Sequence, residues 1–356
     1  MRIRRRLPLI LAVLLVIAAV ALAVVLRKHA PPEAARLLPG ADGFVYVNLG
    51  WMRRANLTGE LPPVPHDPDY EQFIQATGVQ FERDLDEAAL AIHYSGGSAD
   101  TKTGSLQPRF SEVFVGKFDG ERLRAYLRQI SSSVDSYQTR DIYNIPLEGR
   151  TLRVSILGVD TVAASNLDDS QVIRGIIQRS RKLASPFGGP ALLRQYYKEV
   201  PLASLGWAIF KIQPSAGGSV SGPVGWSFLF AKPATAVASV RYLGAVHFKA
   251  QAITASDEEA SQVAARVDTY LNLFRSAEST VPAPGTDADV KTFFDSLKIQ
   301  SQKNRAVLTA AVPVGLIRKL LVETPASIAP QGQPESNSPA ESKNTAKKKK
   351  APNQNR

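Results

Sequence analysis

Hydrophobic and polar positions divide the chain into three regions: an unbroken apolar run, a long middle with regular patterns, and a polar end. The run from Leu7 to Leu26 has 20 residues and no charge. As a helix at about 1.5 Å per residue it would be about 30 Å long, the thickness of a bilayer's hydrocarbon core. We therefore predict one transmembrane helix at 7–26.

A cleaved signal peptide is the alternative to this anchor, because Ala21-Leu22-Ala23 fits a small-x-small cleavage site. The apolar run is longer than the roughly 7–15 residues typical of a signal core, so we favour an uncleaved anchor. Four arginines crowd the first six residues. Such a basic end most simply stays in the cytoplasm, which predicts a bacterial inner-membrane protein with its globular part outside.

The first half of the middle region carries signals for strands and capped helices. Asp67-Pro68 is a helix start and Gly78 a helix stop, which predicts a helix over 68–77. A stripe of apolar residues predicts a second helix at 120–132, and Asp168 is expected to cap a third. Alternating or apolar runs predict strands at 44–49, 88–94, 112–119, 142–146, 150–157 and 160–165.

The second half begins after the chain-breaking residues Pro186 to Pro190. Ser256 and Glu259 form a capping box for a long helix at 257–278. Further helices are predicted at 191–199, 287–296 and 313–321, and strands at 203–212, 234–243, 245–254, 297–302 and 305–312.

This pattern predicts an α+β fold with a mainly antiparallel sheet and helices packed on one face. Phe114 to Asp119 and Phe248 to Thr254 lead into the same order of elements, so two similar lobes are an open alternative. The expected organisation is a basic end, the transmembrane helix, a stalk, a first lobe, a second lobe and a disordered tail, at 1–6, 7–26, 27–36, 37–186, 187–324 and 325–356.

The net charge of +11 lies mostly in the two ends of the chain. Residues 1–30 hold six positive charges and residues 325–356 a net four, so the part between is nearly neutral. The chain has no cysteine, which excludes disulfides, thiolate metal sites and a lipid-modified cysteine. Charge and composition thus favour neither a nucleic-acid-binding fold nor a lipoprotein.

No motif in the sequence indicates chemistry, so we predict no catalytic residue, no metal and no cofactor. No pair among His29, His66, His93 and His247 has the spacing of a helical metal site. The acidic run Glu82, Asp84, Asp86 and Glu87 lacks the glycine turn of a calcium loop and is interpreted as a solvated turn. His247 alternates with Lys249 and Gln251, which predicts the polar face of a strand.

Two segments are candidate contact sites. Trp226, Phe228 and Phe230 flank a Gly/Ser-rich loop and form a possible partner contact, although core packing is the favoured interpretation. Lys347, Lys348, Lys349 and Lys350 could contact an anionic surface such as lipid or an envelope polymer, and without interleaved aromatic residues they disfavour nucleic acid.

The segments Leu37 to Leu49 (LLPGADGFVYVNL) and Val79 to Ala89 (VQFERDLDEAA) resemble a bacterial family of unknown function. Its members join an N-terminal transmembrane helix to an extracytoplasmic domain, and the resemblance extends over about 37–322. It implies the topology above and no activity. The leading hypothesis is a non-enzymatic, membrane-tethered envelope domain that binds a protein or polymer partner. The alternative is an envelope hydrolase whose site is assembled from distant residues.

Overall fold

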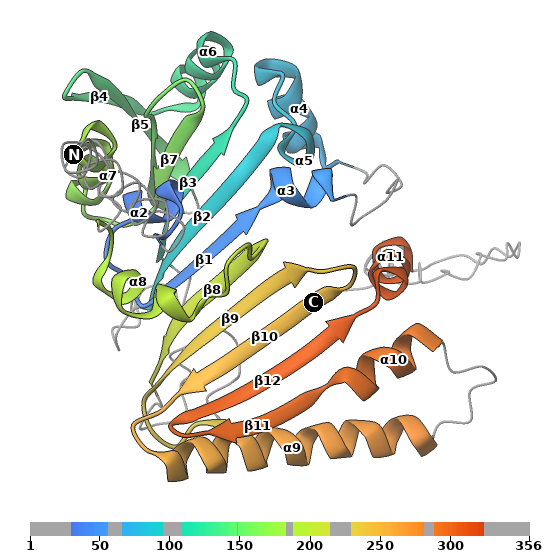
Figure 1. The fold of residues 1–356 in the computed structure, drawn as a ribbon. Helices are drawn as coiled ribbons and strands as arrows, with labels where there is room; N and C mark the ends of the chain where they lie inside the picture. Colours follow the sequence, from blue (N-terminus) through green and yellow to red (C-terminus); the bar gives the residue numbers. More distant parts are fainter. Residues whose placement is uncertain are drawn as a thin grey trace, which may run out of the picture.

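One antiparallel sheet of twelve strands organises the protein in a computed structural model (Figure 1). The structure describes residues 30–55, 66–94, 109–147, 149–182, 188–213, 229–280 and 288–323. The strand order is β11-β12-β10-β9-β8-β1-β2-β3-β7-β6-β5-β4. The expected α+β class with a mainly antiparallel sheet is therefore confirmed.

The strands follow the predicted segments closely, with β4 as an additional strand that the sequence did not indicate. They are β1 (Gly43–Asn48), β2 (Leu85–His93), β3 (Arg109–Gly116), β4 (Ser133–Tyr137), β5 (Arg140–Leu147), β6 (Arg150–Ile156), β7 (Thr161–Ser165), β8 (Gly206–Ile212), β9 (Ala234–Tyr242), β10 (Val246–Ile253), β11 (Lys298–Gln302) and β12 (Arg305–Val312).

The helices connect these strands and begin and end at local signals. They are α2 (Glu33–Leu37), α3 (Leu49–Arg54), α4 (Pro68–Thr77), α5 (Phe81–Asp84), α6 (Gly120–Ile130), α7 (Gln171–Arg181), α8 (Ala191–Tyr196), the short η1 (Tyr197–Glu199), α9 (Asp257–Thr280), α10 (Ala288–Ser296) and α11 (Val314–Glu323). Asp67 accepts a bond from Tyr70 N at the start of α4, and Gly78 ends it in the left-handed conformation at φ 74°.

Two halves of the chain share this sheet, and they meet where β1 pairs with β8 (Val45 opposite Ala208). β1 to β7 lie on one side of the junction, and β8 to β12 lie on the other. Each half begins with three strands in spatial order, followed by a helix (α6 or α9) and a later strand (β7 or β12) that pairs with the third strand. The similar element order expected for two lobes is thus present within one continuous sheet.

Helices lie on both faces of the sheet, not on one face as predicted. The Phe44 face, which carries the side chains of Phe44 and Tyr46, is covered by α2 and α7 over the first half and by α8 beside β8. The Val45 face is covered by α6 over β5 to β7 and by α9 over β11 and β12. Neighbouring residues of β7 show the reason: Ala163 packs with α7 and Ala164 with α6, because successive side chains of a strand alternate.

The folded part begins at an earlier residue than predicted. α2 buries Ala34, Ala35 and Leu37 in the main hydrophobic cluster, so residues 33–36 belong to the domain and not to the stalk. None of the helices in the described ranges is long and apolar enough to cross a bilayer. The predicted anchor at 7–26 and the tail at 325–356 lie outside the described residues.

Candidate functional site

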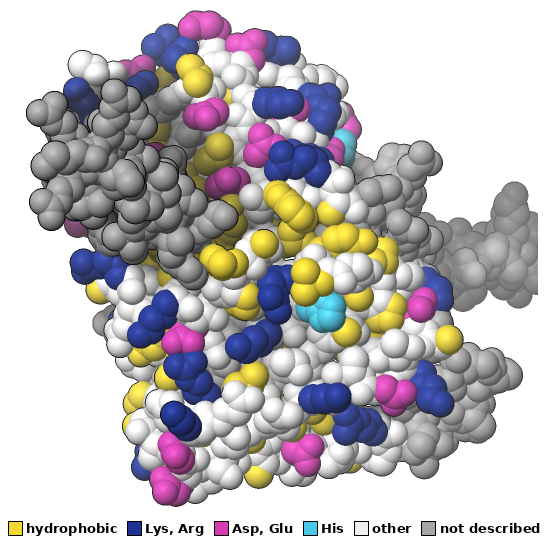
Figure 2. All heavy atoms as spheres, viewed as in Figure 1, with side chains coloured by type: hydrophobic (Ala, Val, Ile, Leu, Met, Phe, Trp, Pro, Cys, Tyr) yellow, Lys and Arg dark blue, Asp and Glu magenta, His cyan; other side chains and the backbone are white. Residues whose placement is uncertain are grey.

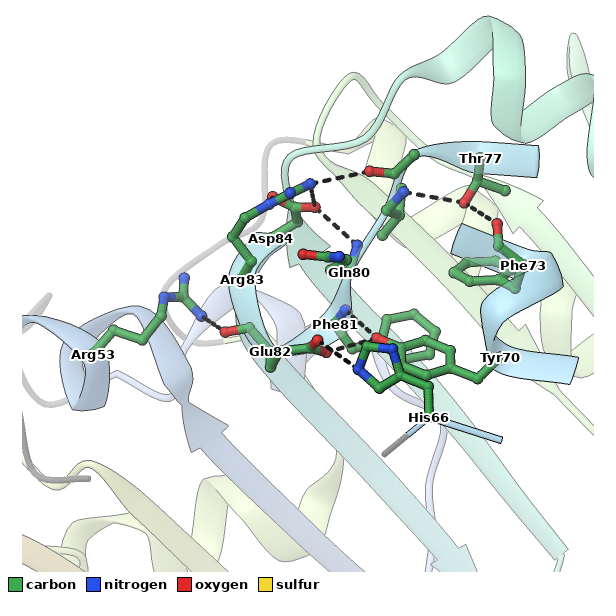
Figure 3. A network of polar contacts seen from close by, with 12 residues as sticks. Arg53, His66, Tyr70, Phe73, Thr77, Gln80, Phe81, Glu82, Arg83 and Asp84 are labelled. Carbon is green, nitrogen blue, oxygen red and sulfur yellow. Dashed lines mark hydrogen bonds and ion pairs between the residues drawn. The ribbon is translucent and has the colours of Figure 1, made fainter. Parts of the chain in front are cut away.

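A polar network joins α4 to α5 at the edge of the sheet where β2 begins (Figure 3). His66 Nδ1 lies 2.7 Å from Glu71 Oε1, and its Nε2 lies 3.2 Å from Glu82 Oε1. The Tyr70 hydroxyl donates to Glu82 Oε2 at 2.7 Å and accepts from the backbone N–H of Phe81 at 2.7 Å. We call His66, Tyr70, Glu71 and Glu82 the His66 latch, because their contacts join the consecutive helices α4 and α5.

The contacts of the His66 latch raise the pKa of its histidine. The hydrogen bond to Glu71 is the main cause, and the nearby Glu82 acts in the same direction. Burial together with the bond to Glu82 raises the pKa of Tyr70 to about 12. A protonated histidine whose two ring nitrogens both face carboxylates donates to both and has no free lone pair, and the raised pKa favours that form, so His66 is a poor general base. The arrangement suits fastening better than catalysis.

The acidic run after α4 is not the solvated turn that the sequence predicted. Asp84 is buried, accepts from Gln80 N at 2.9 Å and pairs with Arg83 at 2.6 Å. Asp86 pairs with Arg53 of α3 at 2.7 Å. These carboxylates therefore hold α3, α5 and β2 together. The partners of Asp84 are its neighbours Gln80 and Arg83, whereas the partner of Asp86 is 33 residues away, and the local sequence could not indicate that pair.

Two further carboxylates are half-buried in the sheet. Burial raises the pKa of Glu87, whose partner is the Tyr46 hydroxyl. Burial alone raises the pKa of Glu112 in β3. Carboxylates with a raised pKa are candidates for proton transfer. Glu87 lies on the face of Tyr46, whereas Glu112 is opposite Leu90 on the Val45 face, so the sheet separates them and they cannot act on one bond.

The outer strands of the second half have a single sign of charge. β9, β10, β11 and β12 contain no Asp or Glu, and all their Lys and Arg side chains lie on the Phe44 face. Arg305 already has an acidic partner, since its guanidinium forms a two-bond ion pair with Glu199 of η1. We call the remaining basic side chains of this face, Arg241, His247, Lys249 and Lys298, the cationic patch.

The strand register sets the spacing of the cationic patch. Arg241 is directly opposite His247, and Lys249 and Lys298 both lie opposite Thr309. Two strand spacings separate the last two lysines, about 10 Å, and His247 is about 7 Å along the strand from Lys249. In Figure 2, Lys and Arg side chains are spread over the lower half of the view, where Figure 1 places β9 to β12, with several Asp and Glu side chains from other segments among them.

Polar residues on the open face of an antiparallel sheet are ordinary. Four paired strands whose charged side chains all have one sign are less so, because such charges repel each other and attract anions. The acid that pairs with this face, Glu199, comes from η1 and contacts Arg305. The sequence indicated that His247 and Lys249 share a polar face, and the register confirms it. Arg241 and Lys298 could not be added without knowing which strands pair.

Of the residues predicted as partner or surface contacts, Phe230 lies within the described residues and the others do not. Phe230 is buried at 6% exposure among Ile212, Val263 and other residues beneath α9, so its ring is part of the core and cannot be the partner contact considered for it. Trp226, Phe228 and Lys347 to Lys350 lie outside the described residues. Within the part of the chain that the structure describes, no group of three or more His, Asp or Glu residues is placed to hold a metal ion.

No protein-family model and no curated protein matches the chain. Three crystal forms of TP0453 are similar in structure. Forms I, III and IV give TM-scores of 0.41, 0.39 and 0.38 at 11%, 10% and 10% sequence identity. Each match covers 82% of this chain and 97% or 98% of that chain. Similarities this distant indicate no function.

Proposed function

We propose that this protein is a non-enzymatic domain tethered to the bacterial inner membrane, which binds an anionic envelope polymer through the cationic patch. The observation that carries the proposal is the absence of any acidic residue from four paired strands whose basic side chains share one face. The apolar run at 7–26 supplies the tether. Tethering raises the local concentration of the domain, so that weak contacts suffice.

The patch suits a polymer because its charges are spread over several strands. Repeated anionic groups along one chain could contact Lys249 and Lys298 together, whereas a small anion would reach one of them. Each basic residue near a strongly anionic surface contributes about 1 kcal/mol, so three of them alter affinity by roughly 100-fold. Such binding weakens as salt rises.

The test is binding of full-length protein in detergent to polyphosphate and to polyglutamate, which carry phosphate and carboxylate groups. The variant replaces Arg241, Lys249 and Lys298 by Gln. The matched control replaces Lys117, Arg124 and Arg128, on and beside α6, by Gln and has the same net charge and the same tail. We expect a roughly 100-fold loss for the patch variant and a small change for the control. Equal losses in both variants would refute a specific patch.

The membrane topology needs its own test. A reporter that is active only outside the cytoplasm, fused after Leu321, should be active. An inactive reporter would reverse the topology and remove the envelope from the proposal.

The alternative of an envelope hydrolase has one supporting feature, the raised pKa of Glu87 and Glu112. Their placement on opposite faces argues against a shared site. Hydrolysis of envelope material that is lost in both Glu87→Gln and Glu112→Gln would favour the enzyme over the binding domain.

A further inference from the structure

Three large apolar side chains are exposed at the ends of separate elements. Trp51 in α3 is 45% exposed, Leu202 before β8 is 50% exposed, and Leu243 in the β9–β10 turn is 65% exposed. Exposed apolar residues scattered singly need no explanation, whereas a group of them marks a contact surface. We call these three side chains the apolar rim.

The apolar rim lies where the central strands β1, β8 and β9 begin or end. β1 ends at Asn48 and leads into α3, and its antiparallel neighbour β8 begins beside that end. Asn48 N donates to Leu205 O at 2.7 Å, and Leu205 N donates to Val240 O at 2.7 Å, so the three segments are bonded in a row. Figure 2 shows hydrophobic side chains gathered where Figure 1 places α3, the start of β8 and the β9–β10 turn.

A buried layer holds these segments in place beneath the rim. Leu205 and Val246 form a small cluster with Met52 of α3 and Tyr242 of β9. The segments are therefore fixed to each other by packing while their outermost side chains face solvent. Such a layer makes the rim a preformed surface.

The backbone beside two of these side chains adopts the left-handed conformation. Ala203 has φ 59°, an uncommon left-handed conformation for alanine, and Ser204 Oγ donates to Pro201 O at 2.7 Å to close the loop. Gly244 has φ 84° in the three-residue turn after Tyr242. Turn positions ordinarily favour Gly, Asn, Asp and Ser, so leucines at both tips call for a reason other than turn formation.

The charge around the rim points to the kind of partner. Residues 49–55, 200–205 and 241–247 contain no Asp or Glu, while they contain Arg53, Arg54, Arg241 and His247. Arg53 is paired with Asp86, and Arg54 is exposed. Apolar side chains that include Trp, bordered by basic residues, match the chemistry of an anionic bilayer surface. A protein partner with an apolar face would not require the basic border.

We propose that the apolar rim docks on the outer surface of the membrane that anchors the chain, with Trp51, Leu202 and Leu243 among the lipid headgroups and Arg54 and Arg241 near anionic lipid. This rests on the proposed tether and adds a second, reversible contact, which orients the domain relative to the bilayer. Each side chain alone contributes little, but the tether makes docking intramolecular.

The chain has no cysteine, so single labelling sites can be introduced into the full-length protein. Trp51→Cys, Leu202→Cys and Leu243→Cys each receive an environment-sensitive dye and are reconstituted into phosphatidylethanolamine–phosphatidylglycerol vesicles. The control is Val134→Cys in the outermost strand β4, where the side chain is 44% exposed. Docking predicts a blue-shifted emission and quenching by lipid-linked quencher at the three rim sites but not at the control.

The opposite pattern would overturn the proposal: rim labels that an aqueous quencher reaches as readily as it reaches Val134→Cys. Energy transfer between labelled copies that grows with protein density, without lipid quenching, would assign the rim to a second copy instead. Vesicle flotation tests the tether independently of rim docking, because a protein without the tether would not float with the vesicles. Variants of Lys249 and Lys298 should leave the fluorescence at the rim unchanged. Failure of polymer binding can therefore be distinguished from failure of membrane docking.

Discussion

Replacing Ile209 by Ala tests whether the two halves of the sheet are one cooperative unit. Ile209 lies in β8 opposite Phe44 of β1 and Val237 of β9, and it is fully buried. Its cluster extends from α2 and α7 in the first half to Val237 in the second. Loss of its side chain therefore weakens packing across the junction and not within one half alone.

The size of the effect follows from the atoms removed. Ile→Ala deletes three carbon groups, and at about 0.8 kcal/mol each their transfer free energy is about 2.4 kcal/mol. The cavity left behind adds to this, because the surrounding β-sheet can collapse only partly. We expect the free energy of unfolding to fall by about 3–4 kcal/mol, whereas Ile209→Val should cost only about 1 kcal/mol.

Urea denaturation of full-length protein in detergent, followed by tryptophan fluorescence and by circular dichroism, measures the change. Trp207 is a suitable probe because it is buried and stacks on Tyr46 across the junction. Both signals should show one transition, shifted to lower urea. Ile142→Ala, at a buried position of β5 in the first half, should shift that same transition. Two transitions, with Ile209→Ala moving only one of them, would refute a single cooperative sheet.

Three further variants test local features. His66→Gln should flatten the pH dependence of the urea midpoint above about pH 6.5, the ordinary pKa of histidine. The pKa of His66 is raised in the folded protein, so its protonated form stabilises the fold fully below that pH, and this stabilisation is lost as pH rises through the raised value. An unchanged profile would show that the His66 latch does not contribute. Glu112→Gln should stabilise the protein at neutral pH, because burial raises the pKa of Glu112 and ionisation then costs stability as pH rises above the ordinary value of about 4.3. The difference should vanish in acid, and a less stable variant at neutral pH would contradict it. Asp119→Ala removes an oxygen that accepts from Glu121 N at 3.0 Å and Arg122 N at 3.2 Å, so thermal unfolding should show a loss of about 1 kcal/mol, and no loss would mean that the cap is dispensable.

Most elements could be predicted because their signals are local. The cap at Asp67, the stop at Gly78 and the capping box at Ser256, where Glu259 N donates to Ser256 Oγ at 3.3 Å, all act within four residues. The strand β4 was missed because its residues are exposed and show no apolar alternation. Asp168 was expected to cap α7, but it pairs with Arg109 at 2.8 Å, and Asp169 instead accepts from Gln171 N.

The candidate sites depend on how segments pack against each other, and this was not predictable. The His66 latch needs the consecutive helices α4 and α5 to fold against each other, and the apolar rim needs the ends of the neighbouring strands β1, β8 and β9 to lie together. The sequence showed the alternation of His247 with Lys249. Only the pairing of β10 with β9 and β12 brings Arg241 and Lys298 onto the same face.

Protection of individual lysines by a bound polyanion tests the central claim most directly. Full-length protein is treated with an amine-acetylating reagent with and without polyphosphate, and modification is measured by mass spectrometry at each lysine. A binding surface on the second half predicts slower acetylation of Lys249 and Lys298 while Lys117 reacts unchanged. Equal protection of Lys117, or no protection at Lys249 and Lys298 when polyphosphate is bound, would contradict it.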